Sequence, residues 1–381
     1  VLALPMDGRF AQAQDPPASG AAPAEPAPAQ PPTVETKPSA AAERKAAEWA
    51  LQVGGTTVIR TPDGKSHDLG GPTAKLPQGE FVVLAIDVSD CPEVKDEGLA
   101  NLKGLTQIED LRLRNTNVTD VGMQALAGLK TLTLLDLKNT KITDTGIDSL
   151  KEMAKMAHLN LSGTAVTDTA ITTVSDLLEL QTLDISNTAI GSVNYLSGLE
   201  KFERLDAANT QIKTLSIRSL KWLSLGGNPI GEREIPRLSG LAALEHLELW
   251  RTGVDDDNVA GLSAMANLKH LNLAGTSITG KGLMRIRSLN NLESLDLTET
   301  LVDDNGLQAL QSFPQLKVLS LANTLITDRG LQSMADFRNR LRELNQLYLF
   351  RTAITSRGLE DIAVAMPGLT YLCHSGTQVG V

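Results

Sequence analysis

A sequence unit of 24 residues recurs in the second half of the chain and constrains the fold more than any other feature. The first leucines of four such units follow one another at constant intervals: Leu247, Leu271, Leu295 and Leu319. One unit has the pattern LxLxxTxI(T/D)DxGLxxLxxLxxL, in which the opening leucines alternate as in a strand. Later apolar residues, such as Leu307 and Leu310, recur at helical spacing. A fixed period of this length indicates a solenoid in which each unit is a strand, a tight turn and a returning helix.

The strand pattern can be followed through most of the chain. Thirteen strand starts align: Ile86, Leu111, Leu135, Leu159, Leu183, Leu205, Leu223, Leu247, Leu271, Leu295, Leu319, Leu347 and Leu372. Most intervals are 24 or 25 residues, but the units that start at Leu183 and Leu205 are shorter and the unit at Leu319 is longer. We expect turns or extended chain instead of helix in the two short units. The long unit is expected to gain a helical turn after Met334.

These units resemble leucine-rich repeats of bacterial-type proteins, in particular the cysteine-containing and ribonuclease-inhibitor-like subtypes with a long helix. Thr or Cys stands here where many such repeats have Asn. The resemblance implies an α/β solenoid of horseshoe form, with a parallel β-sheet on the concave face and helices on the convex face. It also implies that binding another macromolecule is the usual use of the fold.

Two recurring polar positions are predicted to be structural. A column of residues follows the strands: Thr116, Thr140, Thr164, Thr188, Thr210, Thr252, Thr276, Thr300, Thr324, Thr352 and Thr377, with Cys91 and Asn228 as variants. A short hydroxyl or amide there can satisfy the backbone groups that remain where the chain turns away from the sheet. Pairs such as Thr119–Asp120 and Thr143–Asp144 precede the helices and are predicted to cap their N-termini rather than to bind calcium.

The composition divides the chain into four regions. Residues 1–13 resemble the remnant of an export signal, with an apolar start before small residues at Ala11 and Ala13, although an ordinary N-terminal segment is the alternative. Residues 14–42 are rich in Ala and Pro, which predicts a disordered linker. Residues 43–80 are expected to cap the first repeat, with a helix followed by two strands around a turn at 62–64. Residues 81–381 form the predicted repeat domain.

Location and partner class follow from charge and hydropathy. The signal-like start predicts a protein exported to the periplasm, the cell surface or the exterior, with a cytoplasmic location as the alternative. No apolar run is long enough to span a bilayer. The net charge of −10, from 35 basic and 45 acidic residues, argues against a nucleic acid as the main partner. The chain's oligomeric state is left open.

The sequence predicts neither an enzyme nor a cofactor. It lacks the short motifs of nucleotide-binding loops, zinc proteases and serine hydrolases. Cys91 and Cys373 lie at opposite ends of the array, too far apart for a disulfide. His246 and His270 occupy equivalent positions of adjacent strands, close enough to share a metal, but near-identical repeats produce the same coincidence. We predict no metal site and leave this histidine pair open.

Large side chains at solvent-facing strand positions are the candidate partner contacts. Most of the predicted concave surface is acidic or small, and the acidic column comprises Asp87, Asp136, Asp184, Asp206, Glu248 and Asp296. The exceptions are Arg112, Arg114, Lys138, Trp250, Arg251, Tyr348, Phe350 and Arg351. Aromatic residues and arginine are the usual hot-spot types of interfaces. The alternative is that these aromatic rings only stack on neighbouring side chains of the sheet.

The predicted function is a non-catalytic scaffold that binds a protein or peptide on its concave face. The alternative is a substrate-recognition subunit of a multi-protein enzyme, as in F-box leucine-rich-repeat adaptors. Residues 76–81 resemble the opening of an F-box only superficially, because a strand-favouring run follows at Phe81. A helical adaptor segment upstream of the repeats would favour the alternative.

Overall fold

The computed structural model describes residues 40–213 and 215–377. The predicted signal remnant and most of the predicted linker lie outside these residues, so neither prediction is tested. Helix α1 (Ala40–Gln52) begins inside the predicted linker, whose last three residues form the first turn of this helix instead. The Ala-rich composition that suggested a linker is also favourable for a helix once apolar contacts are available.

One sheet of 15 strands, in the order β15 to β3 followed by β1 and β2, runs through the described residues. Its first three strands are β1 (Thr56–Arg60), β2 (Ser66–Gly70) and β3 (Val82–Asp87). The remaining strands have three residues each: β4 (Asp110–Arg112), β5 (Leu134–Asp136), β6 (His158–Asn160), β7 (Thr182–Asp184), β8 (Arg204–Asp206), β9 (Trp222–Ser224), β10 (His246–Glu248), β11 (His270–Asn272), β12 (Ser294–Asp296), β13 (Val318–Ser320), β14 (Gln346–Tyr348) and β15 (Tyr371–Cys373).

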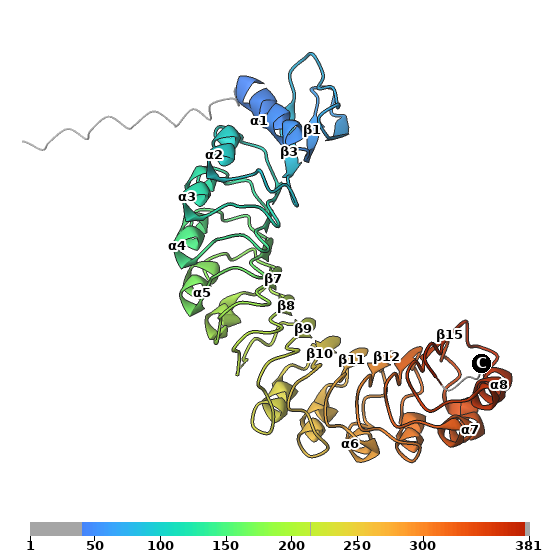
Figure 1. Cartoon of the computed structure of the whole chain (residues 1–381). Coiled ribbons are helices and arrows are strands. Elements are labelled where there is room, and N and C mark those ends of the chain that lie inside the picture. The colour runs from blue at the N-terminus through green and yellow to red at the C-terminus, as the bar shows by residue number, and fades with distance from the viewer. Residues whose placement is uncertain (1–39, 214, 378–381) are drawn as a thin grey trace, which may run out of the picture. The chain divides into compact units, whose positions relative to one another are not determined.

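Strands β3 to β15 are parallel, and each pairs with the next in sequence, with the lead leucines opposite one another, as Leu247 is opposite Leu271. These are the thirteen predicted strands. In Figure 1 the sheet follows the inner side of the curved stack and the helical segments lie on its outer side. The predicted fold class, an open leucine-rich-repeat solenoid, is confirmed.

The N-terminal end of the sheet is formed by an antiparallel β-hairpin and helix α1. Strand β1 pairs with β2 on one side and with β3 on the other, antiparallel in both cases. Ala46, Ala47 and Ala50 of α1 are buried in the core of the repeats. The helix, turn and strands expected in this region are therefore present, and its role as a cap remains a prediction.

The chain between strands forms short helical segments on the outer side of the sheet. The α-helices are α2 (Asp96–Leu99), α3 (Asp120–Met123), α4 (Asp144–Ile147), α5 (Asp168–Val174), α6 (Gly280–Arg285), α7 (Asp328–Asp336) and α8 (Ser356–Ala365). The 3-10 helices are η1 (Ala100–Leu102), η2 (Gln124–Leu126), η3 (Asp148–Leu150), η4 (Asn194–Gly198), η5 (Ile235–Gly240), η6 (Asn258–Ala264), η7 (Gly306–Ser312) and η8 (Arg338–Arg340).

Most of these segments are shorter than the returning helix expected from sequence. In a typical unit one α-helical turn, α3, continues directly into one 3-10 turn, η2. The next apolar residues, Leu129 and Leu132, are both buried in the core after the helical turns have ended.

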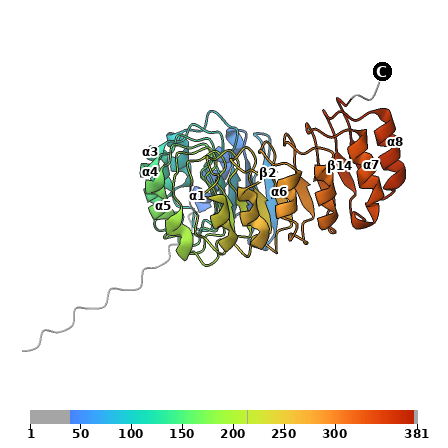
Figure 2. The same cartoon turned by 90° about the horizontal axis from the view of Figure 1, so that it is seen from below.

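The irregular units depart from this pattern. The first short unit contains the 3-10 helix η4 where turns or extended chain were expected, whereas between β8 and β9 residues 207–213 and 215–221 form no helix, as predicted. In the long unit α7 has nine residues and is followed by η8. Figure 2 shows α7 beside α8, the ten-residue helix of the next unit.

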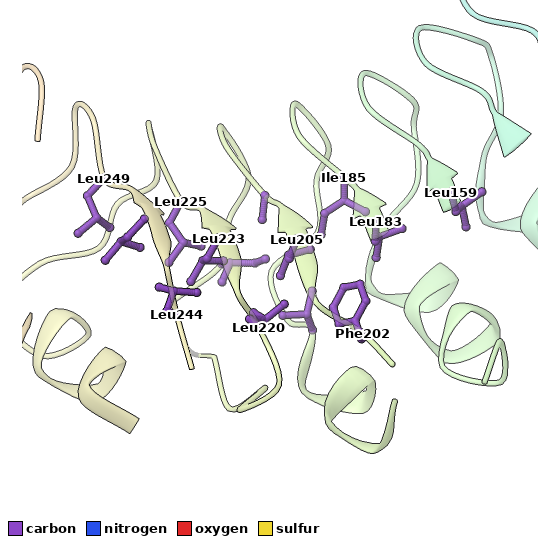
Figure 3. Packing of buried hydrophobic residues seen from close by; sticks show 14 of the residues in the cluster. Leu159, Leu183, Ile185, Phe202, Leu205, Leu220, Leu223, Leu225, Leu244 and Leu249 are labelled. Carbon is purple, nitrogen blue, oxygen red and sulfur yellow. The ribbon is translucent and has the colours of Figure 1, made fainter. Parts of the chain in front are cut away.

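The interior is one continuous apolar core. The strand leucines fill it from the sheet side, and residues such as Phe202 and Leu220 fill it from the outer side, as Figure 3 shows for the short units. Because each unit buries its side chains against its neighbours, stability depends on the stacking of the units.

The threonine column is structural, as predicted. Each threonine hydroxyl donates to the backbone carbonyl three residues earlier, as from Thr116 Oγ1 to the Leu113 oxygen at 2.6 Å. Asn228 replaces threonine in one unit, and its amide donates to the carbonyls of Ala207 and Leu225. The column therefore satisfies the carbonyls that the turn leaves free of the sheet.

The aspartates of the Thr–Asp pairs connect neighbouring repeats, which corrects the prediction that they cap their own helices. The threonine caps the helix, since Thr119 Oγ1 accepts from the Val121 amide. The Asp120 carboxylate instead accepts from the next repeat, from the Thr143 amide at 2.8 Å and the Thr143 hydroxyl at 2.6 Å. A Cβ on Gly146 would lie 2.5 Å from Asp120 Oδ1, which explains the glycine of the TDxG pattern.

Glu43 is a buried carboxylate in α1. Its Oε2 accepts from the Val83 amide at 2.7 Å, whereas its Oε1 has no hydrogen-bond partner among the described residues. Burial raises the pKa of Glu43, and the hydrogen bond from Val83 opposes this in part. The protonated form is thus favoured by folding. This contribution is complete below the usual glutamate pKa and is lost as the pH rises through the raised value.

We expect Glu43→Gln to remove a pH dependence from the docking of α1. In the wild type, hydrogen-exchange protection factors of α1 amides should fall as the pH rises from weakly acidic to neutral. In the variant they should stay level, because the amide does not ionise. Parallel wild-type and variant profiles would show that Glu43 does not govern this docking.

Candidate functional site

Six of the eight predicted partner contacts lie just beyond the strands rather than within them. Only Arg112 and Tyr348 belong to strands, β4 and β14. The others lie three or four residues after a lead leucine: Arg114, Lys138, Trp250, Arg251, Phe350 and Arg351. We name these two positions of all units, from Ser89–Asp90 to Ser375–Gly376, the carboxyl rim. The strands are shorter than the sequence suggested, because the chain turns away from the sheet at the residue four positions after each lead leucine.

Two of the three basic residues near the N-terminal end, Arg112 and Arg114, pair with aspartates. Arg112 forms a two-point interaction with Asp110, and Arg114 pairs with Asp90 at 2.9 Å. The carboxylate of Asp110 raises the pKa of Arg112, and Asp90 does so for Arg114. Lys138 is half-buried. These contacts make this group a weaker candidate than the C-terminal one.

The aromatic residues of the C-terminal half are in contact with their neighbours. A Cβ on Gly226 would lie 2.1 Å from Trp250 Cε2, so the indole covers this glycine of the preceding repeat. The Tyr348 ring lies 5.2 Å from the Tyr371 ring, and its hydroxyl donates to Gln346. Trp250, Tyr348 and Phe350 are all half-buried. For Trp250 and Tyr348, packing against neighbours is therefore part of the role.

The second of the two rim positions, four residues after the lead residue of each strand, has left-handed backbone in every unit. Ten of these positions hold the types that tolerate it: Asp90, Asn115, Asn139, Gly163, Asn187, Asn209, Gly227, Gly275, Asn323 and Gly376. Arg251, Glu299 and Arg351 are the other three. The recurrent Asn or Gly directly before threonine was visible in the sequence, but our sequence reasoning missed it.

The concave surface of the sheet, which we call the floor, carries a stack of planar side chains from four adjacent strands. The Arg204 guanidinium lies 3.3 Å from the centre of the Trp222 ring. His246 stacks on Trp222, and His270 lies next to His246, with 5.2 Å between ring centres in both cases. The sequence suggested only the histidine pair and missed the two larger members.

The histidine pair does not form part of a larger metal-ligand group. Among residues 40–213 and 215–377, no three His, Cys, Asp or Glu side chains are placed to hold a metal ion. His246 Nε2 is already bonded to Glu248 Oε1 at 2.6 Å. Burial lowers the pKa of His270, and the proximity of His246 lowers it further, which favours a neutral ring. Both histidines are members of the stack.

The acidic column is partly structural. Its aspartates accept from the backbone amide two residues later, as Asp136 does from Lys138 and Asp206 from Ala208, both in the manner of an Asx turn. Burial raises the pKa of Asp136 and of Asp206, and nearby Asp184 adds to the effect at Asp206. One carboxylate oxygen of each of these two aspartates therefore forms a structural hydrogen bond. The alternation of strand residues in the sequence does not reveal this role.

A shallow hollow of about 350 Å³ lies on the floor over β5 to β8. Arg112 and Arg204 contribute to its lining, together with Asp136, Asp184 and Asp206. Within it His158 Nδ1 lies 2.9 Å from Thr182 Oγ1. The hollow adjoins the planar stack, since Arg204 belongs to both. The floor thus offers polar, charged and aromatic contacts for another molecule.

Comparison with known proteins identifies the family. The sequence matches the leucine-rich repeat region family over residues 72–379. The chain belongs to the leucine-rich repeat family. A comparison of this leucine-rich repeat chain with curated protein sequences gives no significant match.

Solved leucine-rich repeat structures share the fold. An internalin of Listeria monocytogenes has 23% identity and a TM-score of 0.58, over 79% of this chain and 82% of that one. A leucine-rich repeat protein of Leptospira interrogans has 17% identity and a TM-score of 0.52, over 72% and 80%. TLR13, solved with the single-stranded RNA ssRNA13, has 22% identity and a TM-score of 0.55, over 76% and 45%. At these identities the likeness shows the fold alone.

The leucine-rich repeat fold is typical of non-catalytic binding scaffolds. Among the described residues, no helix of this repeat chain has both the length and the apolar character needed to cross a bilayer.

Proposed function

We propose that this leucine-rich repeat chain is a non-catalytic scaffold that binds a protein or peptide on the concave face of its sheet and along the carboxyl rim. The observation on which this rests is the stack of Arg204, Trp222, His246 and His270 beside a hollow on the sheet floor. Planar side chains that already hold one another in place lose little conformational freedom on binding, which favours affinity.

A protein or peptide partner is favoured over a nucleic acid by the charge of the floor. The TLR13 structure shows that a protein with this fold was solved with RNA. Here, Asp136, Asp184 and Asp206 line the hollow, and the net charge of the chain is −10. Phosphate contacts depend on basic residues, so such a floor disfavours a polyanion.

The adaptor alternative has less support. An adaptor needs a segment upstream of the repeats that is free to bind an enzyme. Helix α1, upstream of the repeats, instead buries Ala46, Ala47 and Ala50 in the repeat core. We therefore favour the simple scaffold.

We further propose that the protein is bacterial and exported to the periplasm, the cell surface or the exterior. Support comes from the signal-like start of the sequence and from the fold shared with the Listeria internalin. Our proposal retains the ribonuclease-inhibitor-like subtype, which α7 and α8 fit best, because they are the longest helices of the described repeats.

The test is selection of peptides from a displayed random library. We expect the wild type to enrich peptides, and Trp222→Ala to weaken their binding at least tenfold, because it removes the ring between Arg204 and His246. Tyr195→Ala, which removes an exposed ring from the outer helix η4, is the matched control. Failure to enrich any peptide, or equal binding by the Trp222 variant, would contradict the proposal.

A further inference from the structure

Three residues of the carboxyl rim have a backbone conformation that their side chains disfavour. Arg251, Glu299 and Arg351 have φ angles of 50°, 59° and 55°, where a Cβ approaches the following carbonyl oxygen. The other ten units have Gly, Asn or Asp at this position. Strained residues of this kind are characteristic of functional sites, where the side chain has a use beyond the fold.

Ion pairs do not explain the two arginines. Arg251 reaches Glu299 at 3.7 Å, but their side chains are 70% and 44% exposed, so solvent weakens the pair. Arg351 forms no ion pair with any residue of 40–213 or 215–377. Neither guanidinium is needed to hold the repeats together.

Two exposed leucines lie between these arginines along the stack. Leu301 is 52% exposed and Leu325 is 60% exposed, and they occupy equivalent positions of adjacent units, two residues after the left-handed position. Their amides donate to equivalent carbonyls, of Ile278 and Val302, so the two leucines are stacked neighbours. The two exposed leucines therefore offer an apolar contact to a partner, and this contact lies between the cationic side chains of Arg251 and Arg351.

We propose that the carboxyl rim from β10 to β14 binds an extended acidic segment of a partner protein. Carboxylates of the segment would pair with Arg251 and Arg351, and an apolar side chain between them would contact Leu301 and Leu325. A guanidinium offers paired donors that match a carboxylate. This proposal rests on the proposed function and specifies the chemistry of the partner.

The spacing of the arginines sets the length of the segment. Arg251 and Arg351 are four units apart, or about 19 Å at about 4.8 Å per strand. An extended chain advances about 3.3 Å per residue, so its two carboxylates should be about six residues apart. This spacing distinguishes the proposal from a general attraction between opposite charges.

Two patterned peptide libraries test the proposal. One has Glu at two positions six apart with randomised apolar residues between them, and the other has Lys at the same positions. The proteins are the wild type, the double variant Arg251→Asn/Arg351→Asn, and the control Arg285→Asn on helix α6. Asparagine suits the left-handed backbone, so the double variant is expected to melt at a higher temperature than the wild type.

The expected result is at least tenfold greater enrichment from the Glu library than from the Lys library. Enriched peptides should bind the double variant at least tenfold more weakly and the Arg285 control unchanged. Weaker binding by a more stable protein cannot result from unfolding. Equal enrichment, preference for the Lys library, no enrichment from either library, or full binding by the double variant would overturn the proposal. If a random library still yields peptides that depend on Trp222, the proposed function stands and only this inference fails.

Discussion

Phe202→Ala is expected to destabilise the protein by about 3–5 kcal/mol, the range for removing a buried phenylalanine ring. Phe202 is 0% exposed and lies in the short units, where Figure 3 shows its ring near Leu183, Leu205 and Leu220. Strand pairing fixes Leu183 and Leu205, so the core cannot close around the lost ring. The free energy of unfolding in urea measures the effect.

Tyr195→Ala is the matched control, because it removes a ring that is 67% exposed on η4 of the same unit. Surface substitutions of this kind usually change stability by less than about 0.5 kcal/mol. A loss at Phe202 no larger than the loss at Tyr195 would show that the short units do not belong to the continuous core.

Asp120→Ala is expected to cost about 2–4 kcal/mol, because it removes two hydrogen bonds to a charged group and leaves the Thr143 amide without its partner. Gly146→Ala should also destabilise, since its Cβ would lie 2.5 Å from Asp120 Oδ1. In the double variant the clash with the carboxylate is absent. Urea unfolding should therefore give a total cost smaller than the sum of the two single costs.

Gly128→Ala is the control for the glycine change, because no atom lies within 4 Å of its Cβ position. It should change stability little. Strict additivity of Asp120→Ala and Gly146→Ala would contradict the contact between the two repeats.

The fold was predictable because the repeat spacing determines strand register. With Leu247 and Leu271 in equivalent positions, a shift of one strand by one residue would turn its own leucine to the solvent face, so only one pairing buries both. The connection through Asp120 was not predictable from one unit, since a carboxylate at a helix start is usually a cap. The recurrent glycine two residues after that aspartate was the available signal.

The site was less predictable because its contacts cross from one repeat to the next. The sequence places Trp250 at a solvent-facing position, but only the structure shows that the indole covers Gly226. The sequence did contain an indication of this contact, because a large residue in one unit stands at the same position as a glycine in the adjacent unit. The conformational strain at Arg251 and Arg351 depends on φ angles that an alternating pattern does not report.

Hydrogen exchange in the presence of a library-selected peptide tests the central claim most directly, because it locates the contact without any substitution. We predict that bound peptide protects amides of β8 to β11 and of the carboxyl rim, including Arg251, while the outer helices α3 to α6 exchange as in the free protein. Protection confined to those outer helices, with the sheet and rim unchanged, would contradict a binding surface on the concave side.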